Sequence, residues 1–188
     1  MPMKARERAP ATYEDLLKLP DDGLRHELID GEHYVTPSPN IRHQAIAGNL
    51  YWIIRGFLEQ HPGGRVFFAP LDILFSMFDV VEPDLLYISA ERLPVLTDKN
   101  VQGAPDLVIE ILSESTRRTD ETIKRRLYER FGVTEYWIVD PELETLKVYH
   151  RVEGAFRRVG EYALETSDEF TTPLFSGLTL RLADVFAL

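Results

Sequence analysis

The sequence has 188 residues, 44% of them hydrophobic, and its 21 Lys and Arg face 31 Asp and Glu for a net charge of -10. A chain of this length and apolar content can bury a core, so we expect one globular domain over residues 1–188. The absence of cysteine excludes disulfides and thiolate metal sites and favours a reducing cytoplasm, while the acidic balance argues against nucleic-acid binding through bulk charge.

The chain opens with a basic tail, and a hairpin follows it. Residues 1–10 lack the apolar core of a signal peptide, and no later apolar run is long enough to cross a bilayer. We therefore expect a cytoplasmic protein without a membrane partner. Asp30 and Gly31 form a strong two-residue turn signal, so residues 26–35 are predicted to form a hairpin that places Glu27 on a short paired strand.

A long amphipathic helix is predicted next. It begins after the Pro-Ser-Pro-Asn segment at residues 37–40 and ends at about His61, before a Pro-Gly-Gly break. Its expected buried stripe comprises Ile46, Leu50, Ile53, Ile54, Phe57 and Leu58. His43 lies in the first turns of this helix, off the expected stripe.

Two strands are predicted after the break. Residues 65–75 are predicted to form one long strand, in which the charged Asp72 stands among apolar neighbours. After a turn near residues 77–79, residues 80–89 form a second strand with Asp84 near its start.

The chain is organised around the run PDLVIEIL at residues 105–112, where a carboxylate lies inside an otherwise apolar strand. Asp106, Val108 and Glu110 share one face because side chains alternate along a strand. Burying the charge of Glu110 is costly without a partner. That partner is either a cation or a structural salt bridge.

A helix with clear end signals follows this strand. Thr119 is the expected N-cap and Gly132 the expected C-terminal cap, and Lys124 borders the apolar stripe that should face a sheet. Residues 135–140, EYWIVD, then read as another buried strand. A strand, helix and strand with short connections form a right-handed crossover, so the two strands should be parallel.

The positions of the carboxylates limit which of them can share a metal ion. Asp106 and Glu110 are four positions apart on an extended strand, roughly 13 Å, which is too far for one cation. Adjacent strands lie only about 4.8 Å apart, so Asp84 could share Mg²⁺ or Mn²⁺ with Glu110, and Lys124 could approach from the following helix. The remaining candidates for this site are Glu27, His43 and Asp72. Two carboxylates, a lysine and a hard divalent metal suit phosphodiester hydrolysis, in which charge builds up on phosphate.

Several motifs resemble those of a known family. The segments HELIDGE, SPNIRH, EPDLLYI, PDLVIEILSEST and GVTEYWIVDP occur in the order seen in the Uma-two family of restriction endonucleases, within the PD-(D/E)XK nuclease superfamily. The resemblance runs from about Tyr13 to the C-terminus. It implies an α/β (α+β) fold, a restriction-endonuclease-like mixed central β-sheet flanked by helices. It also implies a Mg²⁺-dependent endonuclease acting on nucleic acid, with DNA as the expected substrate and a homodimer as the expected assembly.

The resemblance also assigns roles to single residues. Asp84 matches the aspartate of the superfamily signature and Glu110 its second acid, but Leu112 stands where the superfamily has lysine. The resemblance implies that Lys124 has taken over that role from the next helix. Glu27 and His43 match polar positions of the family's first two motifs and would line the same cleft.

Structural roles are the alternative for each of these residues. Glu110 and Lys124 could form a buried ion pair, and Asp106 after a proline could satisfy local backbone donors. Tyr128 is expected at the edge of the core. At the level of the whole protein, the alternative to a nuclease is a non-catalytic descendant of the same fold that acts as a protein-interaction or regulatory module. The pI of 5.0 and Leu112 favour that alternative, whereas the set of two acids and one lysine favours the nuclease.

Overall fold

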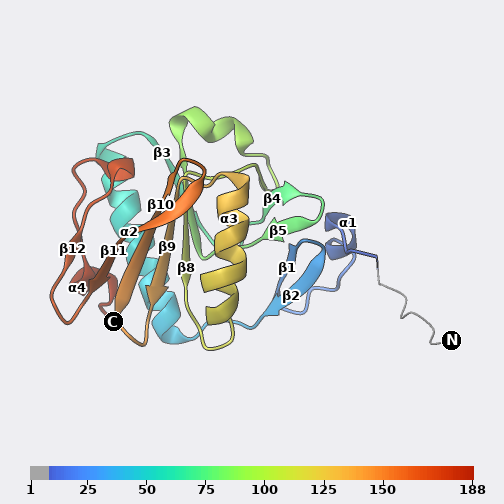
Figure 1. Ribbon diagram of the computed structural model, residues 1–188, viewed down its shortest axis with the longest axis horizontal. Coiled ribbons are helices and arrows are strands. Elements are labelled where there is room, and N and C mark those ends of the chain that lie inside the picture. Colours follow the sequence, from blue (N-terminus) through green and yellow to red (C-terminus); the bar gives the residue numbers. More distant parts are fainter. Residues whose placement is uncertain (1–8) are drawn as a thin grey trace.

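The computed structural model describes residues 9–188, which form two principal β-sheets with helices packed around them (Figure 1). Most of the basic tail lies outside the described residues. No helix in the described part of the chain combines the length and the apolar character needed to cross a membrane. The expectation of a single domain over residues 1–188 stays a prediction.

The central sheet has six strands in the order β11-β10-β9-β8-β6-β3. Its strands are β3 (Gly64–Phe68), β6 (Leu85–Ser89), β8 (Leu107–Ile111), β9 (Glu135–Asp140), β10 (Thr145–Val152) and β11 (Ala155–Ala163). The β8 and β9 strands are parallel, as the crossover pattern predicts, and the other neighbours are antiparallel. The sheet is therefore mixed, and the predicted fold class is confirmed.

A second sheet of five strands lies beside the first, in the order β2-β1-β5-β4-β7. Its strands are β1 (Arg25–Ile29), β2 (Glu32–Thr36), β4 (Ile73–Ser76), β5 (Asp79–Val81) and β7 (Val101–Gln102). The predicted hairpin is confirmed as β1 and β2. Asp30 and Gly31 both have positive φ, 52° and 76°, which is the backbone that a tight hairpin turn requires.

Two helices cover opposite faces of the central sheet. The long helix α2 (Ile41–Gln60) begins at Asn40, whose side chain accepts a hydrogen bond from the His43 backbone N–H at 2.9 Å. It packs on one face, whereas α3 (Arg125–Phe131) packs on the other. The smaller elements are α1 (Tyr13–Leu16), η1 (Ala90–Val95), η2 (Thr119–Lys124), β12 (Glu169–Phe170), η3 (Pro173–Phe175), β13 (Leu180–Arg181) and α4 (Leu182–Val185).

Both strands predicted between residues 65 and 89 are interrupted by proline. The first is broken between β3 and β4, which belong to different sheets, and Pro70 lies in the break. The second is broken between β5 and β6, where Pro83 lies. Proline has no N–H to donate to a neighbouring strand, so it interrupts the strand pairing. At each of these two breaks the chain crosses from one sheet to the other. The second crossing places Asp84 directly before β6.

The predicted N-cap of the helix after β8 is wrong. The backbone is already helical at Arg118, with φ -64° and ψ -40°, so Thr119 lies inside the helix. Ser113 has the capping role instead, because its Oγ accepts from the Thr116 N–H at 3.2 Å. A π-helical turn, η2, leads directly into α3, and the helix ends as predicted at Gly132, which has a φ of 87°.

Candidate active site

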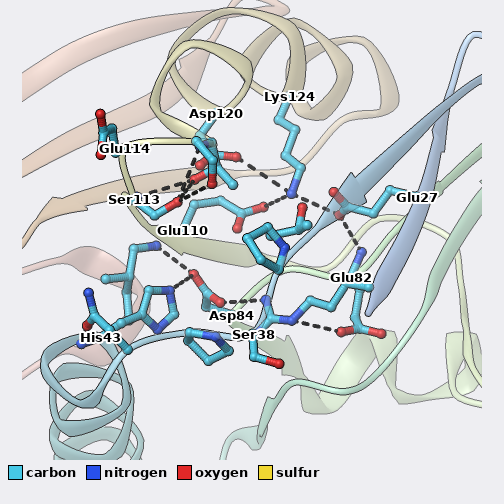
Figure 2. A pocket seen from close by; sticks show the side chains of 18 residues that line it. Glu27, Ser38, His43, Glu82, Asp84, Glu110, Ser113, Glu114, Asp120 and Lys124 are labelled. Carbon is cyan, nitrogen blue, oxygen red and sulfur yellow. Dashed lines mark hydrogen bonds and ion pairs between the residues drawn. The ribbon is translucent and has the colours of Figure 1, made fainter. Parts of the chain in front are cut away.

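A cavity of about 570 Å³ opens where β6 begins and β8 ends. Strand β1, the start of α2 and the π-helical turn η2 complete its walls (Figure 2). Its ionisable lining residues are Arg25, Glu27, His43, Glu82, Asp84, Glu110, Glu114, Asp120 and Lys124. Five of the six candidates named from the sequence belong to this lining: Glu27, His43, Asp84, Glu110 and Lys124.

Sheet register places Asp84 beside Glu110. Leu85 pairs with Ile109 in antiparallel register, so the residues just before and just after this pair are neighbours. Asp84 is only 4% exposed, and its Oδ2 accepts from the Ile111 N–H at 2.8 Å.

Two cationic or potentially cationic groups surround the Asp84 carboxylate. His43 Nε2 lies 3.1 Å from Oδ2, and Arg25 Nη1 donates to Oδ1 at 2.7 Å. Burial raises the pKa of Asp84, but His43 and Arg25 together lower it below its usual value. Asp84 is therefore held ionised.

The burial of His43 corrects the sequence-based expectation for this residue. The sequence predicts that it lies off the apolar stripe of α2, yet it is only 8% exposed. His43 precedes Ile46 and Leu50 by three and seven positions, so it continues the buried face toward the sheet end where Asp84 lies. This spacing is the signal that reveals its burial.

Lys124 is surrounded by three carboxylates. Its Nζ lies 2.8 Å from Glu27 Oε1, 3.1 Å from Glu110 Oε1 and 3.6 Å from Asp120 Oδ1. These four side chains are at most 5% exposed. Lys124 and Asp120 come from the π-helical turn, a form of helix that is frequent at functional sites.

The three carboxylates around Lys124 outnumber the single ammonium that could neutralise them. Burial raises the pKa of Glu110 well above its ordinary value, and the nearby carboxylates of Asp120, Asp84 and Glu27 raise it further against the opposing effect of Lys124. Burial also raises the pKa of Asp120 to about 6. Burial lowers the pKa of Lys124, but its three carboxylate neighbours raise it by more. The ammonium is therefore held charged within an excess of negative charge.

Four contributors to this site were missed or misread in the sequence, one of them Asp120 of the π-helical turn. Tyr128, expected at the core edge, is fully buried and donates its hydroxyl to Glu110 Oε1 at 2.6 Å. Arg25 and Glu82 were not singled out. Arg25 is two residues from Glu27 on β1, so strand alternation puts both on one face, and this is the signal for it. For Glu82 the only signal in the sequence is its position directly before Pro83.

Two other acids lie elsewhere. Asp106 accepts from the Ser89 N–H at 2.7 Å, so it binds a backbone donor as expected, but this donor lies on the neighbouring strand β6 and is not local in sequence. Asp72 does not belong to the described lining of the cavity.

The donor set at the end of β8 suits a hard divalent cation. Asp84 and Glu110 supply carboxylate oxygens, the ligands that Mg²⁺ and Mn²⁺ prefer. Among the described residues, Glu110 Oε2 accepts no hydrogen bond, and no three His, Asp or Glu side chains already form a metal-binding group. A metal ion held by these two acids would also need water or substrate oxygens as ligands.

Comparison with known proteins agrees with this picture. The sequence model of the Uma2 family, described as "Putative restriction endonuclease", matches residues 13–183. The chain is also similar to the crystal structure, at 1.96 Å, of a "putative nuclease belonging to DUF820" from Anabaena variabilis ATCC 29413. The two share 26% sequence identity with a TM-score of 0.79, over 95% of this chain and 98% of that one. No curated protein matches the chain.

Proposed function

We propose that this chain, which belongs to the Uma2 family of restriction-endonuclease-like proteins, is a metal-dependent endonuclease that hydrolyses phosphodiester bonds in DNA. The observation that carries the proposal is the meeting of Asp84, Glu110 and Lys124 in one cavity. Three elements supply these residues: the start of β6, the end of β8 and the π-helical turn. A buried ion pair between Glu110 and Lys124 alone would not require the ionised Asp84 beside them.

Asp84 and Glu110 would hold Mg²⁺ or Mn²⁺. When bound, this ion supplies an activated water and neutralises charge on the phosphate. Lys124 Nζ, held by Glu27 and Glu110, adds a fixed positive charge next to the metal-binding acids. Its task in the reaction is to stabilise the negative charge that develops on the phosphate during attack.

His43 has two functions in this proposal. Its Nε2 orients the Asp84 carboxylate, while its buried Nδ1 has no hydrogen-bond partner among the described residues. An unpaired buried nitrogen is costly, so Nδ1 is suited to hold a water or a substrate oxygen. Glu27 holds the ammonium of Lys124 in place, with Oε1 at 2.8 Å from Nζ. The same oxygen accepts from the Glu82 N–H at 2.8 Å.

The proposal extends to the assembly and the compartment. Cutting both strands of a duplex calls for two active sites, and a homodimer would provide them. A chain without cysteine suits the reducing cytoplasm, where cellular DNA is accessible.

A plasmid cleavage assay with Mg²⁺ or Mn²⁺ tests the proposed function. We expect nicking or linearisation by the wild type and a loss of at least 100-fold in Asp84→Asn, because the variant removes a metal-binding charge. The matched control is Asp106→Asn, which changes a buried acid that lies outside the cavity and can still accept from Ser89. Cleavage that is equal in Asp84→Asn and wild type would contradict the assignment.

A non-catalytic module is the second candidate. Leu112 in place of the superfamily lysine and the pairing of Asp84 with Arg25 favour it. A wild type that binds neither Mg²⁺ nor Mn²⁺ in calorimetry and cuts no nucleic acid would make this the better assignment.

A further inference from the structure

Arg25 lies inside the cavity and pairs with the acid that should bind metal. Its Nη1 donates to Asp84 Oδ1 at 2.7 Å, and its Nε lies 3.1 Å from Glu82 Oε1. The side chain is 21% exposed, so it also faces the open part of the cavity.

Arg25 and a metal ion would compete for the same oxygen. Asp84 Oδ2 is already engaged by the Ile111 N–H and by His43, so Oδ1 is the oxygen left for a metal ion. In the structure the guanidinium of Arg25 occupies Oδ1. A divalent cation there would repel a guanidinium only a few ångströms away, and this repulsion is strong in a partly buried site.

Arg25 is less enclosed than Lys124 and has fewer carboxylate partners. Lys124 is 5% exposed and is held by three carboxylates, whereas Arg25 is more exposed and has two. The contact between Arg25 and Glu82 Oε1 is close but lacks hydrogen-bond geometry, since that oxygen has no hydrogen-bond partner among the described residues. Of these two cations, Arg25 is thus the one better placed to exchange its carboxylate partners for a ligand.

We propose that Arg25 is a phosphate-binding residue that exchanges partners when the metal binds. In the metal-free protein it neutralises Asp84. Metal binding displaces it, and its planar, bidentate guanidinium then binds a phosphate of the nucleic acid. The exchange keeps the site from presenting unpaired acids before the metal arrives and makes phosphate binding depend on the metal. This inference rests on the proposed metal-dependent function.

Titration calorimetry with Mn²⁺ on the purified full chain is the first test. We expect Arg25→Met to bind Mn²⁺ at least threefold more tightly than the wild type, because the variant lacks the competing cation. Arg92→Met is the matched control and should leave Mn²⁺ affinity unchanged, since Arg92 pairs with Asp106 at 3.5 Å and does not line the cavity.

Fluorescence anisotropy with a labelled DNA duplex is the second test. Both proteins carry Lys124→Gln to suppress cleavage, and one also carries Arg25→Met. We expect the Arg25 change to weaken duplex binding by about tenfold with Mn²⁺ present, the loss of one charge-assisted contact, and by less than twofold without metal.

Each outcome separates this inference from the proposed function. If Arg25→Met binds Mn²⁺ no more tightly than the wild type, the proposed exchange of partners by Arg25 is wrong. Cleavage of DNA by the wild type would still support the nuclease assignment in that case. A wild type that binds no Mn²⁺ and cleaves nothing overturns both. If Arg25→Met fails to fold, Arg25→Lys replaces it. Lysine keeps the charge but lacks the bidentate fork, so duplex binding with Mn²⁺ should still fall, and equal binding overturns the inference.

Discussion

At the scale of single residues, the site depends on an imbalance of charge. Glu27, Glu110 and Asp120 share the single ammonium of Lys124, and all four groups are buried. A cluster that served only to stabilise the fold would have equal numbers of positive and negative groups, because an uncompensated buried carboxylate lowers the free energy of unfolding. The excess of acid is what a cation-binding site needs.

Lys124→Met should remove cleavage and also lower stability at neutral pH. We expect a fall in cleavage rate of about 100-fold or more, since a fixed charge near the developing phosphate charge is lost. The melting temperature should fall at pH 7.5 and recover in part at pH 5.5, because loss of the ammonium raises the pKa of Asp120 above its wild-type value of about 6 and favours the protonated, uncharged form as the pH falls. Arg126→Met, an exposed change on the same helix, is the control and should alter neither quantity. If Lys124→Met cleaved DNA at the wild-type rate, the role assigned to Lys124 in stabilising the phosphate charge would be wrong.

Glu110→Gln separates a functional acid from a structural one. The variant removes one carboxylate from the excess, and its amide oxygen can still accept from the Tyr128 hydroxyl. We therefore expect weaker Mn²⁺ binding in calorimetry together with an unchanged or raised melting temperature. A loss of several kcal/mol in the free energy of unfolding would instead support the structural ion pair, since one partner of a buried pair would be missing.

At the scale of elements, the helical segment formed by η2 and α3 aims Lys124 at the sheet. Ser113 fixes its start, and the left-handed backbone of Gly132 ends it before β9. The intervening π-helical turn carries both Asp120 and Lys124. The position of the ammonium thus depends on where this helix begins and ends.

Two glycine substitutions test this account of the helix end. Gly132→Ala should lower the free energy of unfolding by about 1 kcal/mol, because a Cβ disfavours a φ of 87° although open space surrounds it. Gly56→Ala in α2 is the matched control, also in open space but on helical backbone, and should raise stability by about 0.5 to 1 kcal/mol. Urea unfolding measures both. Equal effects of the two substitutions would contradict the role of backbone conformation at Gly132.

At the scale of the whole molecule, the cavity lies where the two sheets meet. The crossings at Pro70 and Pro83 carry the chain between the sheets, so β1 of one sheet faces the end of β8 in the other. Burial at this junction raises the pKa of Glu82 to about 7 and that of Asp120 to about 6. Folding therefore favours the protonated forms of these acids.

Stability of the metal-free protein should fall as pH rises from about 4 to 7. An acid whose pKa is higher in the folded state holds its proton more tightly there, so the folded state loses stability once the pH exceeds the unfolded value, 3.8 for Asp120. For Asp120 alone the change is on the order of 2 to 3 kcal/mol. Asp84 and Asp140 have lowered pKa values, and the stability that they add is lost only below about 3.8.

Urea unfolding between pH 4 and 7.5 measures this dependence. Mn²⁺ should restore stability at pH 7.5, because it binds the folded acids. Stability that rises steadily over this range, or that does not respond to Mn²⁺, would contradict the charge imbalance.

Local patterns in the sequence determined much of the architecture and the main residues of the site. Alternation along β8 placed Glu110 on one face, the Asp-Gly turn predicted the hairpin, and the strand, helix and strand order predicted the parallel pairing. These features depend on backbone geometry and on contacts close in sequence, which residue order encodes directly.

Only the tertiary structure decided which side chains meet. Arg25 and Asp84 are 59 residues apart, and Tyr128 reaches Glu110 from a different element. Such contacts depend on sheet register, on the place where each proline breaks a strand and on the helix turn that faces the sheet. Glu82 and Asp120 owe their raised pKa values first to burial. Burial is a property of the packed molecule, because water is excluded only where several elements come together.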